Sequence, residues 1–333
     1  MAVYLLELGG DDDHFAAFEA RNAARDVQII ATGIATATAI EPDRIRGLAF
    51  TRCAGEFVAL SPADPELAAT ALREHPTDRR GTGAVRARIA RGSSSISTQS
   101  LERQLGAVLV DMGLSVDLTD PDHVLRVVAA DDRCFLYWSS VESIRDYGTR
   151  RPTDKPFFTP GSMDALEARA IANFAGARPG TTLLDPMCGT AGLLIEAGLL
   201  GSMVYGIDAQ SSMVEGSARN LETFLDRPTW DLAIADAARL PFRDDTIDAV
   251  LFDTPYGRQS RIAAASVDEL LSGALTEAYR IAPRTVVVAD RSVEDRARAV
   301  GWSVDVVFER RVHRSMVRFV HVLDRRDGRS TEP

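Results

Sequence analysis

The run Leu183-Leu184-Asp185-Pro186-Met187-Cys188-Gly189-Thr190-Ala191-Gly192 decides the fold of the C-terminal half of this 333-residue chain. An apolar strand ends at an acid, and the backbone then turns through glycines that have no β-carbon to obstruct a ligand. A helix that begins at Leu193 follows with its first amide groups exposed. The turn therefore predicts a nucleotide-like ligand. Its G-x-x-G spacing differs from the G-x-G-x-x-G of pyrophosphate-binding turns, which disfavours a dinucleotide but leaves it open.

Strands and helices alternate around this turn, which predicts an α/β fold with a parallel sheet covered on both faces. The expected strands are residues 182–185, 203–208, 231–235, 247–253, 285–289, 302–308 and 316–323. Because no helix separates the last two, they should form an antiparallel hairpin at one edge of a Rossmann-like, seven-stranded sheet. A closing hairpin is usual in S-adenosylmethionine methyltransferases, whereas a nicotinamide-binding sheet normally continues in parallel.

Two more acids are expected at the ends of neighbouring strands. Asp208 ends the second strand, and Asp236 follows the third. Because ligands of open α/β sheets bind at the carboxyl ends of the strands, these acids and Asp185 should line one pocket. Asp208 could accept hydrogen bonds from two ribose hydroxyls, and Asp236 could accept one from an adenine amino group. Each acid taken alone would serve equally well as a helix N-cap.

The turn Asp253-Thr254-Pro255-Tyr256-Gly257 follows the fourth strand and suits chemistry on an exocyclic amine. The lone pair of such a nitrogen is delocalised into its ring, and hydrogen bonds from its two N–H groups to a carboxylate and a carbonyl would redirect it. Asp253 and the Thr254 carbonyl are the expected acceptors. Pro255 stiffens the turn, and Tyr256 offers a stacking face to a flipped-out base, worth about 1–3 kcal/mol. The alternative is that Asp253–Gly257 is an ordinary turn without a catalytic role.

Taken together, these motifs resemble those of the archaeal tRNA guanine-10 N2-methyltransferases over residues 150–323. The runs Lys155–Met163, Glu167–Asn173 and Glu215–Glu222 also carry the likeness. The family's fourth motif is (N/D)-P-P-(Y/F), and Thr254 here replaces its first proline. The resemblance implies S-adenosylmethionine as cofactor and no metal. It also implies that Phe158 and Thr159 contact the methyl donor. The expected cofactor-binding residues are Phe158, Thr159, Asp185, Pro186, Cys188, Gly189, Thr190, Gly192, Asp208 and Asp236.

The N-terminal half is similar to a THUMP arrangement, through short motifs at Val85–Arg88, Leu101–Gly106 and Val116–Leu118. This resemblance implies capture of the tRNA 3′ end. Arginines with few acids near them in sequence support it because they can bind phosphates, although such a run is often only a solvated face. The expected RNA-binding residues are Arg79, Arg80, Arg86, Arg88, Arg91 and Ser94, and lesser candidates in the final hairpin are Arg310, Arg311, His313 and Arg314.

The expected domains are a ferredoxin-like unit at residues 1–55, a THUMP-like domain at 56–145, a linker at 146–160 and the methyltransferase domain at 161–325. The apolar fraction of 45% and charged fraction of 26% fit an ordinary globular chain. No apolar run reaches the length of a membrane span, and the N-terminus does not look like a signal peptide, so a cytoplasmic protein is expected.

Two features of the composition limit other chemistry. The three cysteines, Cys53, Cys134 and Cys188, are far apart and without a histidine cluster, which predicts neither a zinc site nor a redox pair. The net charge is −10, and Lys155 is the only lysine among 38 basic residues. An acidic balance weighs against nucleic acid unless the arginines cluster.

The resulting prediction is a cytoplasmic, monomeric tRNA methyltransferase that modifies the N2 amine of a guanosine, at position 10, once and then a second time. The expected catalytic residues are Asp253, Thr254, Pro255 and Tyr256. The oligomeric state and the number of methyl groups do not follow from the sequence itself. Three alternatives stay open: an amino-methyltransferase for another tRNA or rRNA base, a nicotinamide-dependent oxidoreductase, and a catalytically inactive RNA-binding module.

Overall fold

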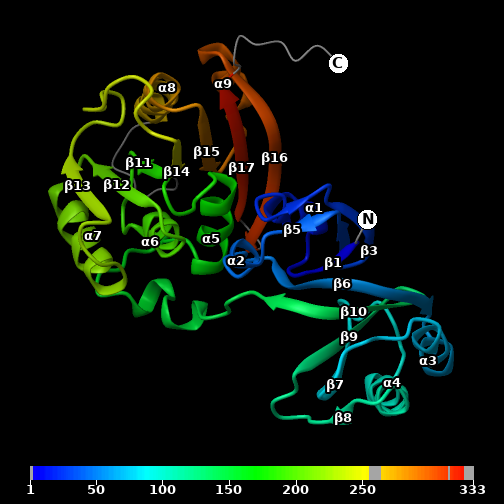
Figure 1. Cartoon of the computed structure of the whole chain (residues 1–333). Coiled ribbons are helices and arrows are strands. Elements are labelled where there is room, and N and C mark those ends of the chain that lie inside the picture. The colour runs from blue at the N-terminus through cyan, green and yellow to red at the C-terminus, as the bar shows by residue number, and fades with distance from the viewer. Residues whose placement is uncertain (1–2, 255–263, 314–315, 326–333) are drawn as a thin grey trace. The chain divides into compact units, whose positions relative to one another are not determined.

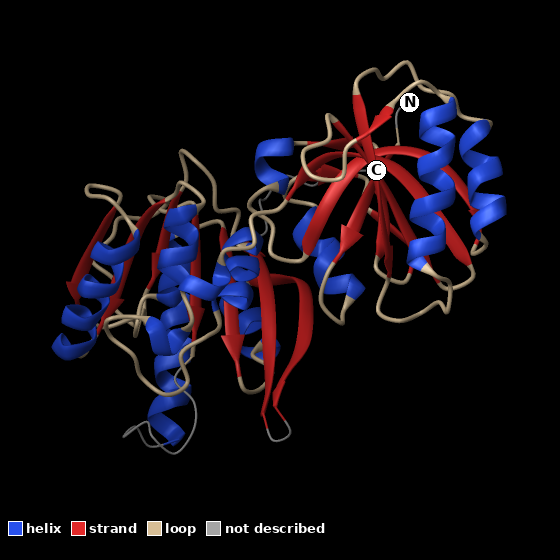
Figure 2. Cartoon of the chain, turned by 90° about the horizontal axis from the view of Figure 1, so that it is seen from below, coloured by secondary structure: helices blue, strands red, loops and turns tan. Residues whose placement is uncertain are grey.

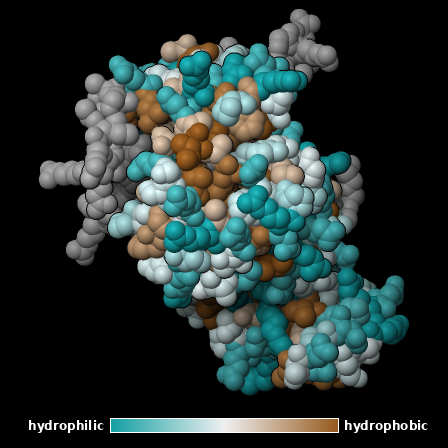
Figure 3. Space-filling model, turned by 90° about the vertical axis from the view of Figure 1, so that its left-hand side faces the viewer, coloured by the Kyte–Doolittle hydropathy of each residue, from teal (hydrophilic) through white to brown (hydrophobic). Residues whose placement is uncertain are grey.

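The computed structural model describes residues 3–254, 264–313 and 316–325, in two compact units that divide between Ile144 and Arg145. Figure 1 labels their elements, and Figure 2 shows that the strands of each unit are flanked by helices. The face drawn in Figure 3 is mostly hydrophilic or neutral, with hydrophobic residues in small groups. Within the described ranges, no helix is both long and apolar enough to cross a bilayer.

The first unit contains one large sheet and four helices in the part of the chain that is described. Its elements are β1 (Tyr4–Leu8), α1 (Asp13–Ala20), β2 (Ala24–Arg25), β3 (Gln28–Ala31), β4 (Ile34–Ala37), β5 (Ala39–Ile40), α2 (Pro42–Ile45), β6 (Thr51–Pro62), α3 (Pro65–Arg73), β7 (Thr82–Ile89), α4 (Thr98–Asp111), β8 (Ser115–Val116), β9 (His123–Ala130) and β10 (Arg133–Glu142). The sheet order is β3-β4-β1-β6-β10-β9-β7-β8, and β2 pairs separately with β5.

Strand β6 lies at the centre of this sheet. It pairs with β1 on one side and with β10 on the other, and it runs unbroken through residue 55, where the sequence suggested a domain boundary. The helix α4 has a side-chain cap at its N-terminus, since Ser97 Oγ accepts a hydrogen bond from the Ser100 amide at 3.2 Å. The strands on both sides of residue 55 therefore belong to one eight-stranded, hydrogen-bonded sheet, from which only β2 and β5 among the described strands of this unit are separate.

A buried carboxylate on β1 joins that strand to three others of the sheet. The side chain of Glu7 on β1 is fully buried, and its oxygens lie 2.7 Å from Arg88 Nε on β7 and 3.2 Å from Arg126 Nη2 on β9. The Tyr137 hydroxyl on β10 donates to the same carboxylate at 3.0 Å. Burial lowers the pKa of the Arg88 guanidinium and raises the pKa of the Tyr137 hydroxyl. Removing one member of such a buried cluster leaves an uncompensated charge, at a cost of about 3–5 kcal/mol.

The second unit is an α/β sheet, as the sequence predicts. Its strands and α-helices are α5 (Ala165–Phe174), β11 (Thr182–Asp185), α6 (Gly192–Leu199), β12 (Met203–Asp208), α7 (Ser211–Phe224), β13 (Trp230–Ile234), β14 (Ala249–Asp253), α8 (Ala264–Ile281), β15 (Arg284–Ala289), α9 (Glu294–Val300), β16 (Trp302–His313) and β17 (Met316–Arg325). The sheet order is β13-β12-β11-β14-β15-β17-β16.

The predicted closing hairpin is confirmed. Strands β11 to β15 pair in parallel, while β17 lies between β15 and β16 and is antiparallel to both. The central strands are apolar on both faces: Val250 and Leu251 of β14, which point to opposite faces, are both fully buried, and Leu275 of α8 packs in one cluster with Val250. This rigid core fixes the position of the strand ends from which the site is built.

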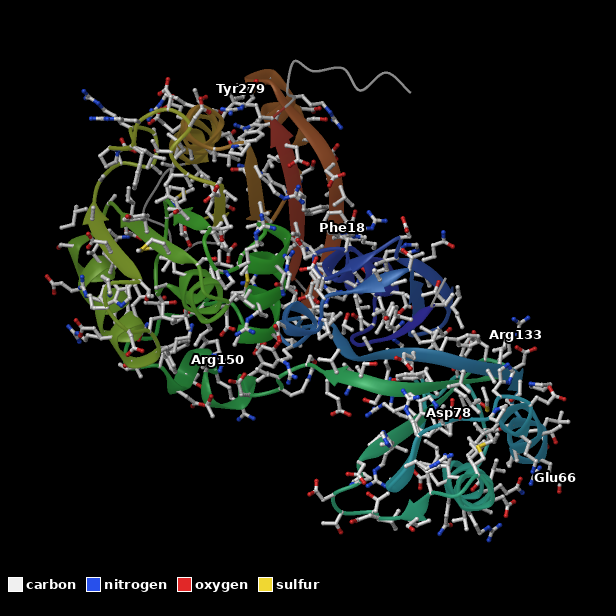
Figure 4. All side chains as sticks on the ribbon, in the orientation of Figure 1. Phe18, Glu66, Asp78, Arg133, Arg150 and Tyr279 are labelled. Carbon is white, nitrogen blue, oxygen red and sulfur yellow. The ribbon has the colours of Figure 1, made fainter. Side chains whose placement is uncertain are left out.

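The segment expected to be a linker packs into the second unit. It forms two short 3₁₀ helices, η1 (Tyr147–Thr149) and η2 (Pro152–Asp154). Arg150, labelled in Figure 4, is 3% exposed, and its Nε donates to Glu196 Oε1 on α6 at 2.7 Å. The other oxygen of Glu196 lies 2.7 Å from Arg169 Nη2 on α5. Because the guanidinium of Arg150 is buried against the Glu196 carboxylate, this part of the segment is held against α6.

Candidate active site

A cavity of about 300 Å³ opens where the parallel strands of the second unit end. It brings together the residues that the sequence assigned to three strand ends and the glycine turn. The predicted residues that line it are Asp185, Pro186, Cys188, Gly189, Thr190, Gly192, Asp208, Asp236 and Asp253. The described lining also contains residues that the sequence reasoning missed: Gly161, Ser162, Met163, Met187, Leu193, Ala209, Gln210, Met213, Ala237 and Leu270.

The described charged residues that line this cavity are all acidic. It contains four aspartates, and no lysine, arginine or histidine is among its described residues. An anionic pyrophosphate would be repelled by such a lining, whereas a cationic ligand rich in hydroxyl groups would be attracted. The cavity therefore fits a sulfonium nucleoside better than a nicotinamide dinucleotide.

Asp208 binds the backbone of the glycine turn and of the start of α7. One oxygen of this carboxylate accepts the Gly189 amide at 3.1 Å, and the other accepts the Gln210 amide at 2.9 Å. Gly189 has φ +52° and Ala191 has φ +59°, so the chain bends sharply before α6 begins. Each oxygen of Asp208 has a second lone pair, which leaves acceptor capacity for a ligand hydroxyl.

Asp185 is the most buried acid of the cavity. Its carboxyl group is 2% exposed and accepts the Met187 amide at 3.0 Å. Burial raises the pKa of Asp185 well above its ordinary value, and the neighbouring carboxylates of Asp208 and Asp253 raise this pKa further. A cationic ligand in the cavity would offset both effects.

Gly206 and Cys188 pack closely beneath the glycine turn. A Cβ at Gly206 on β12 would come within 2.7 Å of Leu194 Cδ1 and 3.2 Å of Cys188 Sγ, so a larger residue would disturb the packing under the turn. Burial raises the pKa of the Cys188 thiol, which therefore stays protonated. Cys188 therefore lines the cavity as a buried thiol.

The predicted catalytic turn is described only at its start. Asp253 ends β14, and its Oδ2 lies 3.6 Å from Arg318 Nη2 on β17. Thr254 is 6% exposed, and its amide donates to the Val288 carbonyl on β15 at 2.8 Å, which fixes the beginning of the turn. Pro255 and Tyr256 lie outside the described residues, as does Arg314.

The structure does not place Phe158 and Thr159 in the lining of this cavity. The Phe158 side chain is 42% exposed, and its contact with a methyl donor stays a prediction. Its neighbour Phe157 is held instead, because Asn220 on α7 accepts the Phe157 amide at 2.9 Å and donates to its carbonyl at 2.8 Å. Thr159 contributes through its carbonyl, which accepts the hydroxyl of the lining residue Ser162 at 2.8 Å.

The predicted RNA-binding arginines have mixed surroundings. Arg79 lies 2.8 Å from Glu56 and stacks 4.8 Å from the centre of the Trp138 ring, while Arg88 is bound to the buried Glu7. Arg91 forms an ion pair with Asp13 at 2.5 Å, and Arg86 donates to the Leu118 carbonyl at 2.5 Å. Arg80 is exposed, and Ser94 is half-buried. These acids come from distant parts of the sequence, which is why a local count of charges missed them. Arg80 and Arg86 keep the strongest case for phosphate contact.

Within the described part of the chain, no group of three or more histidine, cysteine, aspartate or glutamate side chains is arranged to hold a metal ion. Cys53, Cys134 and Cys188 are buried free thiols.

Two family models match the chain. One is described as an RMKL-like methyltransferase domain and matches residues 152–319, and the other is a THUMP domain and matches residues 65–139. A tRNA (guanine(10)-N2)-dimethyltransferase of Methanothermobacter thermautotrophicus is 33% identical over 72% of this chain and 72% of its own length. One from Pyrococcus abyssi is 31% identical over 74% of this chain and 75% of its own length.

Solved structures show the same fold. TrmN from Thermus thermophilus aligns over 97% of this chain and 99% of its own, with a TM-score of 0.52 and 22% identity. The likeness extends through both units of the chain. The predicted resemblance is thereby confirmed, and this chain belongs to the RMKL-like methyltransferase family, alongside the tRNA (guanine(10)-N2)-dimethyltransferases.

Proposed function

We propose that this chain transfers methyl groups from S-adenosylmethionine to the N2 amine of a guanosine in tRNA, at position 10. The observation that carries the proposal is the position of Asp253 at the rim of a cavity lined by four carboxylates and by no described basic residue. The relatives named above are described as enzymes of this reaction, and they support the choice of substrate.

The cavity residues would bind the methyl donor in defined roles. Asp208 would accept the ribose hydroxyls through its second lone pairs, and the exposed Asp236 would accept from the adenine amino group. The buried carboxyl of Asp185 would face the positive charge of the ligand. The bound donor supplies an electrophilic methyl group, so the protein has mainly to position the two partners.

Asp253 and Thr254 would hold the acceptor amine. A carboxylate and a carbonyl that accept its two N–H groups would draw the lone pair out of the ring and toward the methyl group. Arg318, whose Nη2 lies 3.6 Å from Asp253 Oδ2, favours the ionised carboxylate that this role requires. Pro255 and Tyr256 keep their proposed roles in stiffening the turn and stacking the base.

Further parts of the proposal concern the substrate and its setting. The first unit would bind the tRNA 3′ end through its THUMP domain, so that a distant contact selects the base that reaches Asp253. Two successive transfers would give the dimethylated base named for the relatives. A tRNA substrate would place the enzyme in the cytoplasm, and the organisms of the relatives support an archaeal source.

Methyl transfer to tRNA transcripts tests the proposal. The chain is incubated with labelled S-adenosylmethionine and either the normal transcript or one with guanosine 10 changed to adenosine, and the modified nucleoside is identified by mass spectrometry. We expect label only in the normal transcript, as N2-methylguanosine and its dimethyl form. Equal label in both transcripts would exclude position 10, and full activity of Asp253→Ala would exclude the proposed role of Asp253. Donor binding without any transfer to RNA would favour an inactive RNA-binding module.

A further inference from the structure

A second cavity of about 520 Å³ adjoins the first within the same unit. The two share the segment Gly161–Met163 as a common wall. The second cavity lies between the start of α5, the end of β15 and the hairpin of β16 and β17. Its remaining lining residues are Pro152, Asp164, Leu166, Glu167, Ile171, Val288, Arg310, Arg311, Arg318 and Val320.

The charge of this second cavity is the opposite of the first. Three arginines line it, against the two carboxylates of Asp164 and Glu167, in a chain whose net charge is −10. Arg310 and Arg318 are direct cross-strand partners in the hairpin. Like charges placed opposite each other destabilise a sheet, so this arrangement has a cost. Three guanidinium groups in one lining offer charge-assisted hydrogen bonds to an anion such as a phosphate.

The arginines are fixed in place. Arg310 Nη2 lies 2.8 Å from Glu167 Oε1 on α5. Arg318 donates to the Gly161 carbonyl at 3.2 Å and lies 3.6 Å from Asp253, so it spans the wall between the two cavities. Arg311, next to Arg310 on β16, is exposed at the opening. Arg318 therefore links the second cavity to the proposed catalytic carboxylate, which lines the first, and Arg311 adds a solvent-exposed guanidinium to the second.

The rest of the lining is apolar. Ile171, Val288 and Val320 are each 1–2% exposed residues of α5, β15 and β17, and Met163 and Leu166 continue the same surface. A volume of about 520 Å³ lies in the range of small-molecule sites, which commonly combine an apolar lining with a few placed polar groups. A purine ring can pack on such a surface, and a phosphate can bind the guanidinium groups at its end.

We infer that this second cavity receives the target nucleotide, with its purine against Ile171, Val288 and Val320 and its flanking phosphate on Arg311. The inference rests on the proposed function and adds to it the site where the acceptor nucleotide binds. The methyl donor and the acceptor then occupy two adjoining cavities of opposite charge, and Asp253 of the first lies 3.6 Å from Arg318 of the second.

The test uses guanosine 3′,5′-bisphosphate, titrated by calorimetry into the full chain saturated with S-adenosylhomocysteine. Arg311→Glu should weaken binding of the bisphosphate about tenfold or more, because repulsion replaces a charge-assisted contact. Its effect on guanosine without phosphates should be less than about twofold. The matched control is Arg219→Glu, an exposed arginine on α7 outside both linings, which should bind as the wild type does.

Methylation of tRNA gives the second measurement. Arg311→Glu should lower kcat/KM about tenfold or more while its affinity for S-adenosylhomocysteine stays that of the wild type. Wild-type values of bisphosphate binding or of kcat/KM in Arg311→Glu would overturn the inference, as would no wild-type binding up to about 10 mM bisphosphate. If the charge-dependent binding is found but no tRNA is methylated, the proposed function fails and the nucleotide site stands.

Discussion

Replacing Asp208 by asparagine should weaken binding of the methyl donor while the chain stays folded. The two carboxylate oxygens accept the amides of Gly189 at 3.1 Å and Gln210 at 2.9 Å, and their remaining lone pairs are the proposed acceptors for the ribose. Asparagine keeps one oxygen and puts an NH₂ group in the place of the other. One backbone amide and one ribose hydroxyl therefore lose their acceptor.

The size of the effect follows from that count. One hydrogen bond from the ligand to a charged group is worth about 1.5–3 kcal/mol, or about 10- to 150-fold in the dissociation constant. The lost backbone contact adds about 1 kcal/mol of destabilisation, which is local to the turn. We expect the melting temperature to fall by only a few degrees.

Calorimetric titration with S-adenosylhomocysteine measures the change in affinity. Asp231→Asn is the control, because Asp231 is exposed on the neighbouring strand β13 and lies outside the cavity lining. The 2′-deoxy form of the ligand gives a second comparison: the wild type should discriminate against it, and Asp208→Asn should discriminate less. Unchanged affinity and unchanged discrimination in a folded Asp208→Asn would refute the assignment of the ribose to this carboxylate.

Two predictions concern stability. Glu196→Gln should lower the free energy of unfolding, measured by chemical denaturation, by about 3–5 kcal/mol because it leaves the buried Arg150 and Arg169 without their shared carboxylate. The control is Glu222→Gln, since Glu222 is exposed. Equal stability of the two variants would contradict the reasoning. Because the pKa of Asp185 is raised in the fold, the ligand-free wild type should lose stability as pH rises from about 4 toward 7, and Asp185→Asn should lose less. Denaturant unfolding at both pH values checks this, and parallel curves for the two proteins would show that Asp185 is not the source.

The acids at the strand ends could be predicted because their position follows from local pattern. A parallel sheet brings the carboxyl ends of its strands to one edge, so Asp185, Asp208 and Asp253 had to meet once their strands were recognised. The hairpin of β16 and β17 could also be predicted, since no helical stretch separates the two strands in the sequence. These features depend on periodicity and chain order alone.

Other features depend on contacts between distant segments. Asn220 on α7, 63 residues further along the chain, binds the backbone of Phe157 and so holds the segment that contains Phe158. Gln210 and Met213 line the cavity because α7 starts beside the glycine turn, and the closeness of Gln210 to Asp208 was the one signal that could have found it. The acid partner of Arg88 lies on the first strand, and a local count of charges has no access to such pairs.

The carboxylate of Glu7 has a practical consequence for work on the RNA-binding half. A fragment that starts after residue 55 would cut the twelve-residue β6 and remove Glu7, the buried partner of Arg88 and one of two carboxylate partners of Arg126. Such a truncation should give aggregated material, even though the matched THUMP segment, 65–139, is retained whole. Expression of this half in isolation should therefore start at the first strand, and domain exchange between relatives should move residues 3–144 as a single cassette.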